Sequence, residues 1–430
     1  MPAPIQPDPT SHHARASLSE HGGLGRPPRL KKDSKMADGT RVDDPGLYNR
    51  TPAIAAMAMM TNLGALTMLL TPAVIASYAS EGHFSAAQAS TLTSAELAGM
   101  TAAVLLTSLI LNQIDRRRWV TFGLLIAAAA HLASIFAEGY PLLLVARTIA
   151  GTGIGVVYTV AVGALAATAL PDRNFGFAIT ANQLAATSVL AVCSWIGLNH
   201  GHGPTLSVIL AFTLLTGLGI PWFPRRAPAP AAATDATDAF RTPSSIIPGL
   251  LGLLGMFMFL LGVGMVWPIV GLIAQSHGIT SSVVGSALAL AGIGGIGAGL
   301  LVSTLGTRFG RLFPLCIGSL GIAAAMLLLI ITYDNWMLLF VAPVIMFFWI
   351  FSIPYYLGAM SGLDSTGRLA VLSSAMMPFG LAAGQMLATS IVRGSNYAPT
   401  ITISAALFVA GLAAIMFGLI AGSGRKKPGP

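Results

Sequence analysis

The sequence contains few charged residues. Lys, Arg, Asp and Glu together make up 9% of the 430 residues, whereas hydrophobic residues make up 54%. Soluble domains carry about 25% charged residues, so this composition excludes an ordinary soluble protein. Cysteine is also scarce, because Cys193 and Cys316 are the only two and both lie in apolar runs. The sequence therefore implies no disulfide framework.

Long apolar segments are what the chain has instead. Windows of about 20 residues find stretches long enough to cross a bilayer. A β-barrel would show weaker, alternating segments of about ten residues, so we predict an all-α membrane protein. The twelve predicted transmembrane helices are 52–80, 87–111, 119–137, 141–168, 177–198, 205–223, 248–274, 281–305, 312–332, 336–360, 370–392 and 398–421.

Polar segments divide the chain. Residues 1–50 are rich in Pro, Ser, His and basic residues and are expected to form a disordered cytoplasmic tail. Residues 224–247 form the long interior polar stretch, which we interpret as a cytoplasmic linker. The predicted units between and after them are a six-helix bundle at 51–223, a second at 248–422, and a short cytoplasmic tail at 423–430.

The basic residues follow this topology. All but two of the 23 Lys and Arg residues fall on one side of a twelve-helix arrangement. By the positive-inside rule, both termini and the linker are cytoplasmic, and the protein lies in the inner (plasma) membrane. This distribution also accounts for the net charge of +8 without a nucleic-acid partner. The two exceptions are Arg393, in an external loop, and Arg147, inside the fourth helix.

The two halves share a pattern. Pro72 and Pro268 each fall late in the first helix of a half, and each is followed ten residues later by a glycine, Gly82 or Gly278. We infer a parallel repeat of six plus six helices related by a pseudo-two-fold axis. Such repeats place a binding site at their interface near the middle of the membrane.

Two loops resemble the signature of the major facilitator superfamily, Gly-x-x-x-Asp-Arg-x-Gly-Arg. The loop LNQIDRRRW after the second helix contains Asp115 and Arg116, and the equivalent loop GTRFGRLF of the second half contains Arg308, Gly310 and Arg311. The resemblance implies the two-bundle fold of that superfamily and a transport function. Arg116 and Arg311 are expected either to hold the cytoplasmic ends together by ion pairs or only to set the topology.

The fourth helix carries a second resemblance. In LLLVARTIAGTGIGVVY, Arg147 is followed by Gly151, Gly153 and Gly155, which is similar to the Arg-x-x-x-Gly-x-Gly pattern of proton-coupled members. The resemblance implies a proton-coupling role for Arg147. The fifth helix lacks the Gly-Pro pattern of many drug antiporters, which weakens the case for drug export.

Glu96 is the one carboxylate within a predicted helix, and Arg147 is the one permanent cation. Their depths differ by about 6 Å at 1.5 Å per residue, so we expect them to meet. Arginine favours an ionised carboxylate and desolvation favours a protonated one, so a transport cycle that alternates these environments loads and releases a proton. The alternative is a static ion pair that only fixes helix packing.

Histidine and glycine give weaker indications. The motif His200-x-His202 lacks the three or four ligands of a zinc site, so we predict no metal or other cofactor. We expect solvated loop positions for His83, His200, His202 and His277, and a packing role for His131. The glycines expected to allow close helix approach, for static packing or for sliding, are Gly151, Gly155, Gly292, Gly294, Gly295, Gly297 and Gly299.

Candidate solute contacts are polar or aromatic side chains at middle depth in helices that line the cavity of this superfamily. The expected cavity is mostly apolar with one cation, which suits an uncharged or weakly acidic organic solute. The candidates are Asn62, Thr67, Tyr158, Asn182, Gln183, Trp267, Trp349 and Gln385.

The leading hypothesis is a monomeric, proton-coupled secondary transporter (a symporter) that moves a small organic solute by alternating access. The alternative is proton-driven efflux of a hydrophobic drug or toxic metabolite. We do not expect an enzyme, because the helices lack a nucleophile with its base or a metal cluster. The sequence contains no phosphate-binding Gly-x-x-x-x-Gly-Lys-[Ser/Thr] loop, which ATP drive would need. It also shows no ring of charged residues, which a channel would be expected to carry.

Overall fold

The computed structural model describes residues 45–423, except 138, 227–245, 307, 332–333, 364–367 and 395. The predicted terminal tails and the linker lie largely outside these described residues. Throughout the described part the secondary structure is helical, apart from an isolated bridge between Arg393 and Asn396. The all-α fold class is confirmed.

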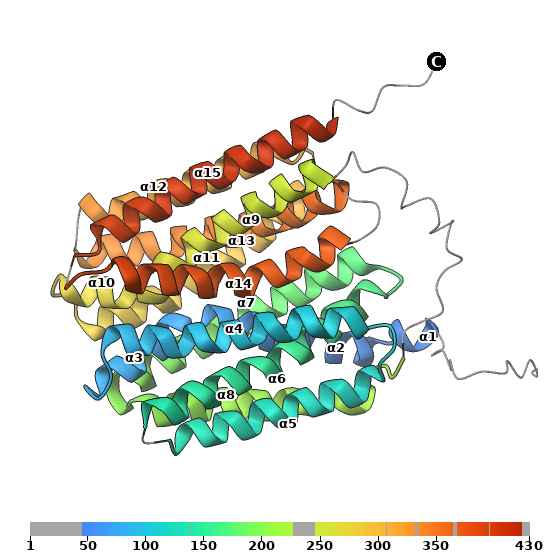
Figure 1. Cartoon of the computed structure of the whole chain (residues 1–430), viewed down its shortest axis with the longest axis horizontal. Coiled ribbons are helices and arrows are strands. Elements are labelled where there is room, and N and C mark those ends of the chain that lie inside the picture. Colours follow the sequence, from blue (N-terminus) through green and yellow to red (C-terminus); the bar gives the residue numbers. More distant parts are fainter. Residues whose placement is uncertain are drawn as a thin grey trace, which may run out of the picture. The chain divides into compact units, whose positions relative to one another are not determined.

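Two sets of helices follow one another along the chain (Figure 1). The first set is α1 (Pro45–Tyr48), α2 (Thr51–Leu69), α3 (Thr71–Ser80), α4 (Ala86–Ile110), α5 (Arg116–Ile135), α6 (Tyr140–Ala166), α7 (Pro171–His200), α8 (His202–Gly217) and the 3-10 turn η1 (Ile220–Trp222). The second set is α9 (Ile246–Val266), η4 (Trp267–Ile269), α10 (Val270–Ser276), α11 (Ser281–Leu305), α12 (Leu312–Ile331), α13 (Asn335–Leu363), α14 (Arg368–Ile391) and α15 (Ala398–Ser423).

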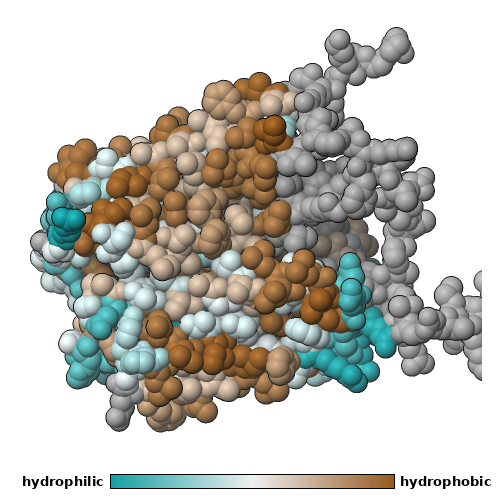
Figure 2. Space-filling model, in the orientation of Figure 1, coloured by the Kyte–Doolittle hydropathy of each residue, from teal (hydrophilic) through white to brown (hydrophobic). Residues whose placement is uncertain are grey.

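Within the described residues, eleven helices are long and apolar enough to cross a membrane. The twelfth predicted helix corresponds to α14, which has 24 residues and is not among these eleven. Large apolar side chains point outward from the helices; Leu109, Phe136 and Trp336 are 77%, 75% and 81% exposed. Figure 2 shows apolar side chains along the sides of the helices and hydrophilic residues gathered near their two ends, as a bilayer requires.

Proline interrupts the first membrane helix of each half. Pro72 has no amide proton to offer the carbonyl of Met68, so α2 ends at Leu69 and α3 begins at Thr71. The hydroxyl of Thr71 donates to that carbonyl instead, at 3.2 Å. In the second half, Pro268 lies in η4, which separates α9 from α10. The two breaks occupy matching positions, as the predicted repeat requires.

The two halves meet along a few helices. α4 packs against α14, α7 packs against α11, and α3 contacts η4. In Figure 1, α4 and α14 run side by side across the centre of the view. We call the end of the helices near α1 the α1 face, and the opposite end, with the α3–α4 and α7–α8 connections, the α3 face.

Glycines allow α4, α5 and α6 to approach closely. A Cβ atom at Gly151 would collide with the backbone of Glu96, and one at Gly155 would collide with the following turn of α4. Gly123 of α5 and Gly153 of α6 face each other, so that a Cβ on either would collide with the carbonyl oxygen of the other. The start of α6, which carries Arg147, is therefore held close to both α4 and α5.

The α11 glycines divide into two groups. A Cβ at Gly292 or Gly295 would collide with side chains of α7, and one at Gly294 would collide with the backbone of α13. The expectation of close approach is wrong for Gly299, where a Cβ would meet no atom within 4 Å, and for Gly297, where Phe347 alone lies at van der Waals distance. Gly299 lies one turn after Gly295, so the close contact of α11 with α7 at Gly292 and Gly295 does not continue at Gly299.

Candidate functional site

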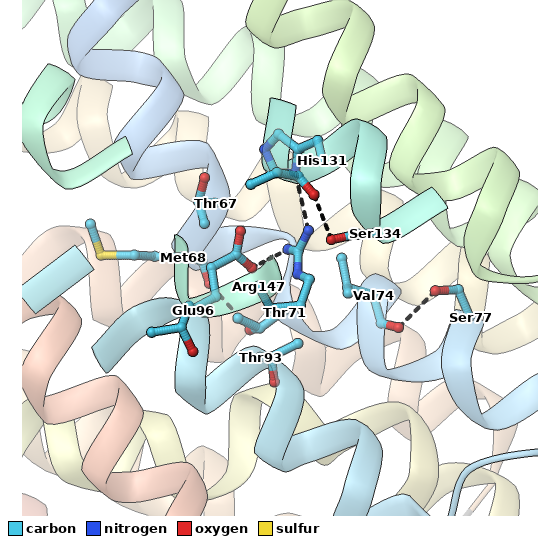
Figure 3. A network of polar contacts seen from close by, with 12 residues as sticks. Thr67, Met68, Thr71, Val74, Ser77, Thr93, Glu96, His131, Ser134 and Arg147 are labelled. Atoms are coloured by element: carbon cyan, nitrogen blue, oxygen red, sulfur yellow. Dashed lines mark hydrogen bonds and ion pairs between the residues drawn. The ribbon is translucent and has the colours of Figure 1, made fainter. Parts of the chain in front are cut away.

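Glu96 and Arg147 form a buried ion pair. Glu96 lies in the middle of α4 and Arg147 in the first part of α6, and Nη2 of Arg147 donates a hydrogen bond to Oε2 of Glu96 (Figure 3). Glu96 is 4% exposed and Arg147 is 1% exposed. Removing one partner of such a pair leaves an uncompensated buried charge, which costs about 3–5 kcal/mol. The two charges therefore depend on each other.

His131 of α5 is a third member of this cluster. Its Nδ1 lies 3.0 Å from Nη1 of Arg147, and its side chain is fully buried. A guanidinium group only donates, so Nδ1 accepts and the neutral ring carries its proton on Nε2. The expectation that His131 only packs is wrong, because the close contact of α5 with α6 brings the third membrane helix to Arg147. Its being a histidine inside a membrane helix is the signal that could have identified it.

Small polar side chains surround the cluster. Figure 3 shows Thr67, Thr71 and Thr93 next to Glu96 and Arg147. The hydroxyls of Thr67 and Thr71 donate to backbone carbonyls of α2, so their protons are already used. The cluster thus lies where the broken first helix, α4 and α6 meet.

Three polar atoms of the cluster have no hydrogen-bonding partner within the described part of the chain. They are Oε1 of Glu96, Nε of Arg147 and Nε2 of His131. Buried polar groups nearly always have a partner, either protein or water. The cluster can therefore accept a proton, a water molecule or a solute group without breaking a hydrogen bond of the protein.

The same segment of α4 joins the two halves. The side-chain oxygen of Gln385 in α14 accepts hydrogen bonds from Thr93 at 2.7 Å and from Ser94 at 3.0 Å. Thr93 and Glu96 are three residues apart on α4 and lie on one helix face. Nε2 of Gln385 is buried and has no partner among the described residues. The charged cluster is thus adjacent to a polar contact between the halves, which the Ser- and Thr-rich sequence STLTS at the start of α4 could have indicated.

Three of the candidate solute contacts gather between α2, α7 and α11. With its amide oriented so that both ends are satisfied, Asn62 donates to the carbonyl of Ala178 at 3.0 Å and accepts from the backbone of Asn182 at 3.2 Å. The Asn182 amide donates to Oε1 of Gln183 at 3.2 Å. Gln183 packs against Gly295 of the other half. This group is a second polar contact at the interface.

Aromatic candidates also lie at the interface. The rings of Trp267 and Trp349 are edge to face with centroids 6.1 Å apart, and Nε1 of Trp349 has no partner within the described residues. Tyr158 of α6 packs over Gly64, and its hydroxyl lies 3.9 Å from the sulfur of Met377 in α14. Trp267, through Leu69, and Tyr158, through Met377, contact the other half, whereas Trp349 packs against Trp267 of its own half.

None of the eight candidate residues lines either of the two cavities that the structure describes. The larger cavity, of about 310 Å³, lies at the α1 face, where its walls include Arg50, Arg117, Trp222 and Arg225. The smaller lies near Asp334 at the α3 face. The smaller cavity is lined mainly by apolar side chains but has a volume of only about 10 Å³, and neither cavity lies among the candidate solute contacts.

The loop motif of the first half caps and anchors α5. The carboxylate of Asp115 accepts a hydrogen bond from the backbone of Arg118 at 3.1 Å. Arg116 is 3% exposed and donates Nη1 to the hydroxyl of Tyr48 at 3.0 Å, and that hydroxyl donates to the carbonyl of Arg226. The motif therefore ties α5 to α1 and to the segment after η1.

Within the described residues neither Arg116 nor Arg311 forms an ion pair, so their role in holding the cytoplasmic ends together stays a prediction. Tyr48, which accepts the hydrogen bond from Arg116, lies in the same half as Arg116. Arg308 is exposed, and Gly310 adopts a φ of +69° in the turn before α12. Positive φ favours glycine, so this residue of the second motif has a conformational role.

His202, one of the four histidines expected in solvated loops, is held against a neighbouring helix. His202 is the first residue of α8, and its Nδ1 lies 2.6 Å from Oε2 of Glu81. The backbone amide of His202 also donates to Oε1 of Glu81, at 2.7 Å. The expectation is wrong for His202 because helix α8 begins earlier than residue 205, which brings its first turn against the end of α3.

Comparison with known proteins agrees with this architecture. Residues 52–253 match the model of the Major Facilitator Superfamily. The fold is similar to that in a crystal structure of a mutant of the peptide transporter POT, with a TM-score of 0.68 and 13% sequence identity, over 86% of this chain and 95% of that chain. No curated protein sequence matches significantly. At 13% identity the structural likeness concerns the fold alone.

The fold and the buried charged cluster define a multi-pass membrane transporter rather than an enzyme. The family model spans α2 to the first turns of α9, and the structural match extends the same architecture through the second half. Residues 52–253 match the Major Facilitator Superfamily, and the family resemblance drawn from the motifs is confirmed by this match.

Proposed function

We propose that this chain is a proton-coupled secondary transporter, which moves a small organic solute across the inner (plasma) membrane by alternating access of its two bundles. Both termini and the linker are cytoplasmic in this proposal, because all but two of the 23 Lys and Arg residues then lie on the cytoplasmic side. The α1 face is then cytoplasmic and the α3 face external.

The position of the ion pair next to the interface supports proton coupling. Glu96 lies one turn from Thr93 and Ser94, which bind Gln385 of the other half. A movement of α14 along α4 alters the surroundings of Glu96, and protonation of Glu96 removes the charge that holds Arg147. Proton binding and the movement of the halves are thereby linked, as population shift requires.

The contacts between the halves support a state closed at the external face. Trp267 and Gln385 make their contacts in the part of the interface toward the α3 face. Toward the α1 face, the close contact of α11 with α7 does not continue at Gly299. We assign the structure to a conformation that is closed on the external side. In this conformation the solute exchanges with the cytoplasm.

We propose the solute contacts from the buried polar atoms that have no partner among the described residues. Nε2 of Gln385 and Nε1 of Trp349 would donate to the solute, and Oδ1 of Asn182 would accept from it. The other candidates, Asn62, Thr67, Tyr158, Gln183 and Trp267, contact the protein and would shape the site. An uncharged or weakly acidic solute with both acceptors and donors fits this set.

The test begins with a thermal-shift screen of purified protein against weak organic acids, polar neutral metabolites and small peptides. Peptides belong in the panel because the structural relative is a peptide transporter. For each solute that stabilises the protein, proteoliposomes then report two rates: accumulation driven by a pH gradient, and counterflow without a gradient. The sign of accumulation distinguishes uptake from efflux.

Glu96→Gln is expected to abolish accumulation driven by the pH gradient and to leave counterflow partly intact, because the amide holds no proton to transfer. Asp334→Asn, the same chemical change at an exposed residue that caps α13, is the matched control and should behave like the wild type. Normal concentrative transport by Glu96→Gln would overturn the proton-coupling role.

A further inference from the structure

A second ionisable pair lies at the α3 face of the same bundle. Glu81, at the end of α3, accepts from both the ring and the backbone of His202, at 2.6 and 2.7 Å. The side chains of His202 and Glu81 are 15% and 24% exposed, so the pair is in contact with solvent. It is the described ion pair nearest to the entrance of this bundle from the α3 face.

The local sequence positions this pair. Gly201, which ends α7 and precedes α8, has a φ of +82°, and a Cβ there would collide with the carboxylate of Glu81. Glycine is therefore needed both for the turn and for the approach of the carboxylate. Ser80 also donates to the carbonyl of Gly197 at 2.8 Å, which fastens the end of α3 to α7.

Tyr78 lies between this pair and the buried cluster. Its ring stacks on the ring of His202, with centroids 5.0 Å apart and an interplanar angle of 26°. Tyr78 is fully buried, and its hydroxyl has no hydrogen-bonding partner within the described residues. Figure 3 shows Val74, one turn before Tyr78 on α3, beside Arg147, and α3 packs against α4, which carries Glu96.

We propose that Glu81, His202 and Tyr78 form the route by which protons pass between the α3 face and Glu96. The inference rests on the proposed proton coupling at Glu96, and it adds the path that supplies that site. A buried hydroxyl without a protein partner is usually satisfied by internal water, and such water would complete the path beside Arg147.

Each step is a proton transfer and balances without a further reactant. A proton from solvent reaches Nε2 of His202 through water, because this nitrogen is buried; it is the acceptor when Nδ1–H donates to Glu81, and it has no partner within the described residues. The hydroxyl oxygen of Tyr78 then receives a proton through water as it passes its own proton on. Glu96 becomes protonated, Arg147 keeps its charge, and Tyr78 ends unchanged.

The groups that face the relay are few. Within the described residues, His202 contacts Glu81, Tyr78 and the ring of Phe84, and Phe84 in turn contacts Tyr140. Tyr140 carries a hydroxyl at the same face but no contact with the relay, which makes it a matched control.

The experiment uses the whole protein in proteoliposomes, with a solute identified by the screen. Tyr78→Phe keeps the ring and removes the hydroxyl, so we expect transport driven by the pH gradient to slow by about tenfold or more, since a positioned proton donor commonly contributes 100-fold or more. Counterflow at equal pH should stay within about twofold of the wild type, because solute exchange needs no proton transfer. Tyr140→Phe should match the wild type in both assays.

Glu81→Gln and His202→Gln are expected to slow transport driven by the pH gradient and to leave counterflow close to the wild-type rate, because the first proton acceptor of the relay is weakened or lost. Wild-type rates in Tyr78→Phe and Glu81→Gln, with Glu96→Gln still uncoupled, would overturn the relay and leave the proposed function standing. An equal loss of counterflow in Tyr78→Phe would also overturn it. Retained coupling in Glu96→Gln would instead overturn the proposed function.

Discussion

The indole nitrogen of Trp267 donates a hydrogen bond to the backbone carbonyl of Leu69 at 3.3 Å. Leu69 is the last residue of α2, and Trp267 begins η4, so this bond joins the interrupted first helices of the two halves. It lies in the part of the interface toward the α3 face. An opening of that face must therefore break it.

Trp267→Phe is expected to increase the population open at the α3 face about threefold, because a hydrogen bond between membrane helices contributes about 0.6 kcal/mol. Distances between spin labels at His83→Cys and Ser281→Cys, in protein without Cys193 and Cys316, would measure this population.

Trp349→Phe is the matched control, since the indole nitrogen of Trp349 has no partner among the described residues. Equal shifts in the two variants would mean that ring volume, and not the hydrogen bond, holds the interface closed.

Gly151→Ala is expected to lower the free energy of unfolding by about 1–3 kcal/mol, because the added methyl group collides with the backbone of Glu96. Thermal unfolding in detergent measures the change. Gly299→Ala adds the same group where the structure has open space, so its stability should equal or exceed that of the wild type. A loss of similar size in both variants would contradict the close packing of α4 on α6.

His131→Leu removes the acceptor of a hydrogen bond from a buried guanidinium group. We expect a loss of about 1–3 kcal/mol in unfolding free energy, the usual cost of an unsatisfied buried donor. His131→Asn retains an oxygen close to the position of Nδ1 and should recover part of this loss in the same assay. If His131→Leu and His131→Asn had the same free energy of unfolding, the contact with Arg147 would make no measurable contribution to stability.

Asp115→Ala removes the side-chain acceptor that caps α5 and should cost about 1 kcal/mol of stability. Asp115→Asn keeps an acceptor and should cost less. Arg118→Ala tests the nearby ion pair, which is 3.6 Å long and has an arginine side chain that is 87% exposed. Exposed pairs contribute about 0–1 kcal/mol, so a large effect of Arg118→Ala would contradict the capping explanation.

The pairing of Glu96 with Arg147 could be predicted because charged residues inside membrane helices are rare and need a partner. With one acid and one base in the predicted helices, residue counting along two helices was sufficient. The role of His131 could not be predicted in this way, because depth alone does not say which face of α5 is turned to α6. That rotation depends on the contact of Gly123 with Gly153.

The same limit applies to the glycines and to the polar contacts between halves. Gly295 and Gly299 are indistinguishable in the sequence pattern, yet one packs against Gln183 and the other faces open space. The difference arises because two helices that touch at one turn can separate at the next. Likewise, Gln385 could be selected as a polar residue of α14, but its partners Thr93 and Ser94 could not.

The sequence by itself determined that this is a helical membrane transporter, which helices cross the membrane, and which two charges must meet. It could do so because the cost of placing polar groups in lipid acts on each segment separately. The tertiary structure alone decided that His131 joins the pair, that His202 binds Glu81, and that α4 binds α14 beside Glu96. Those contacts depend on how the helices are rotated and packed, which is set jointly by side chains far apart in the chain.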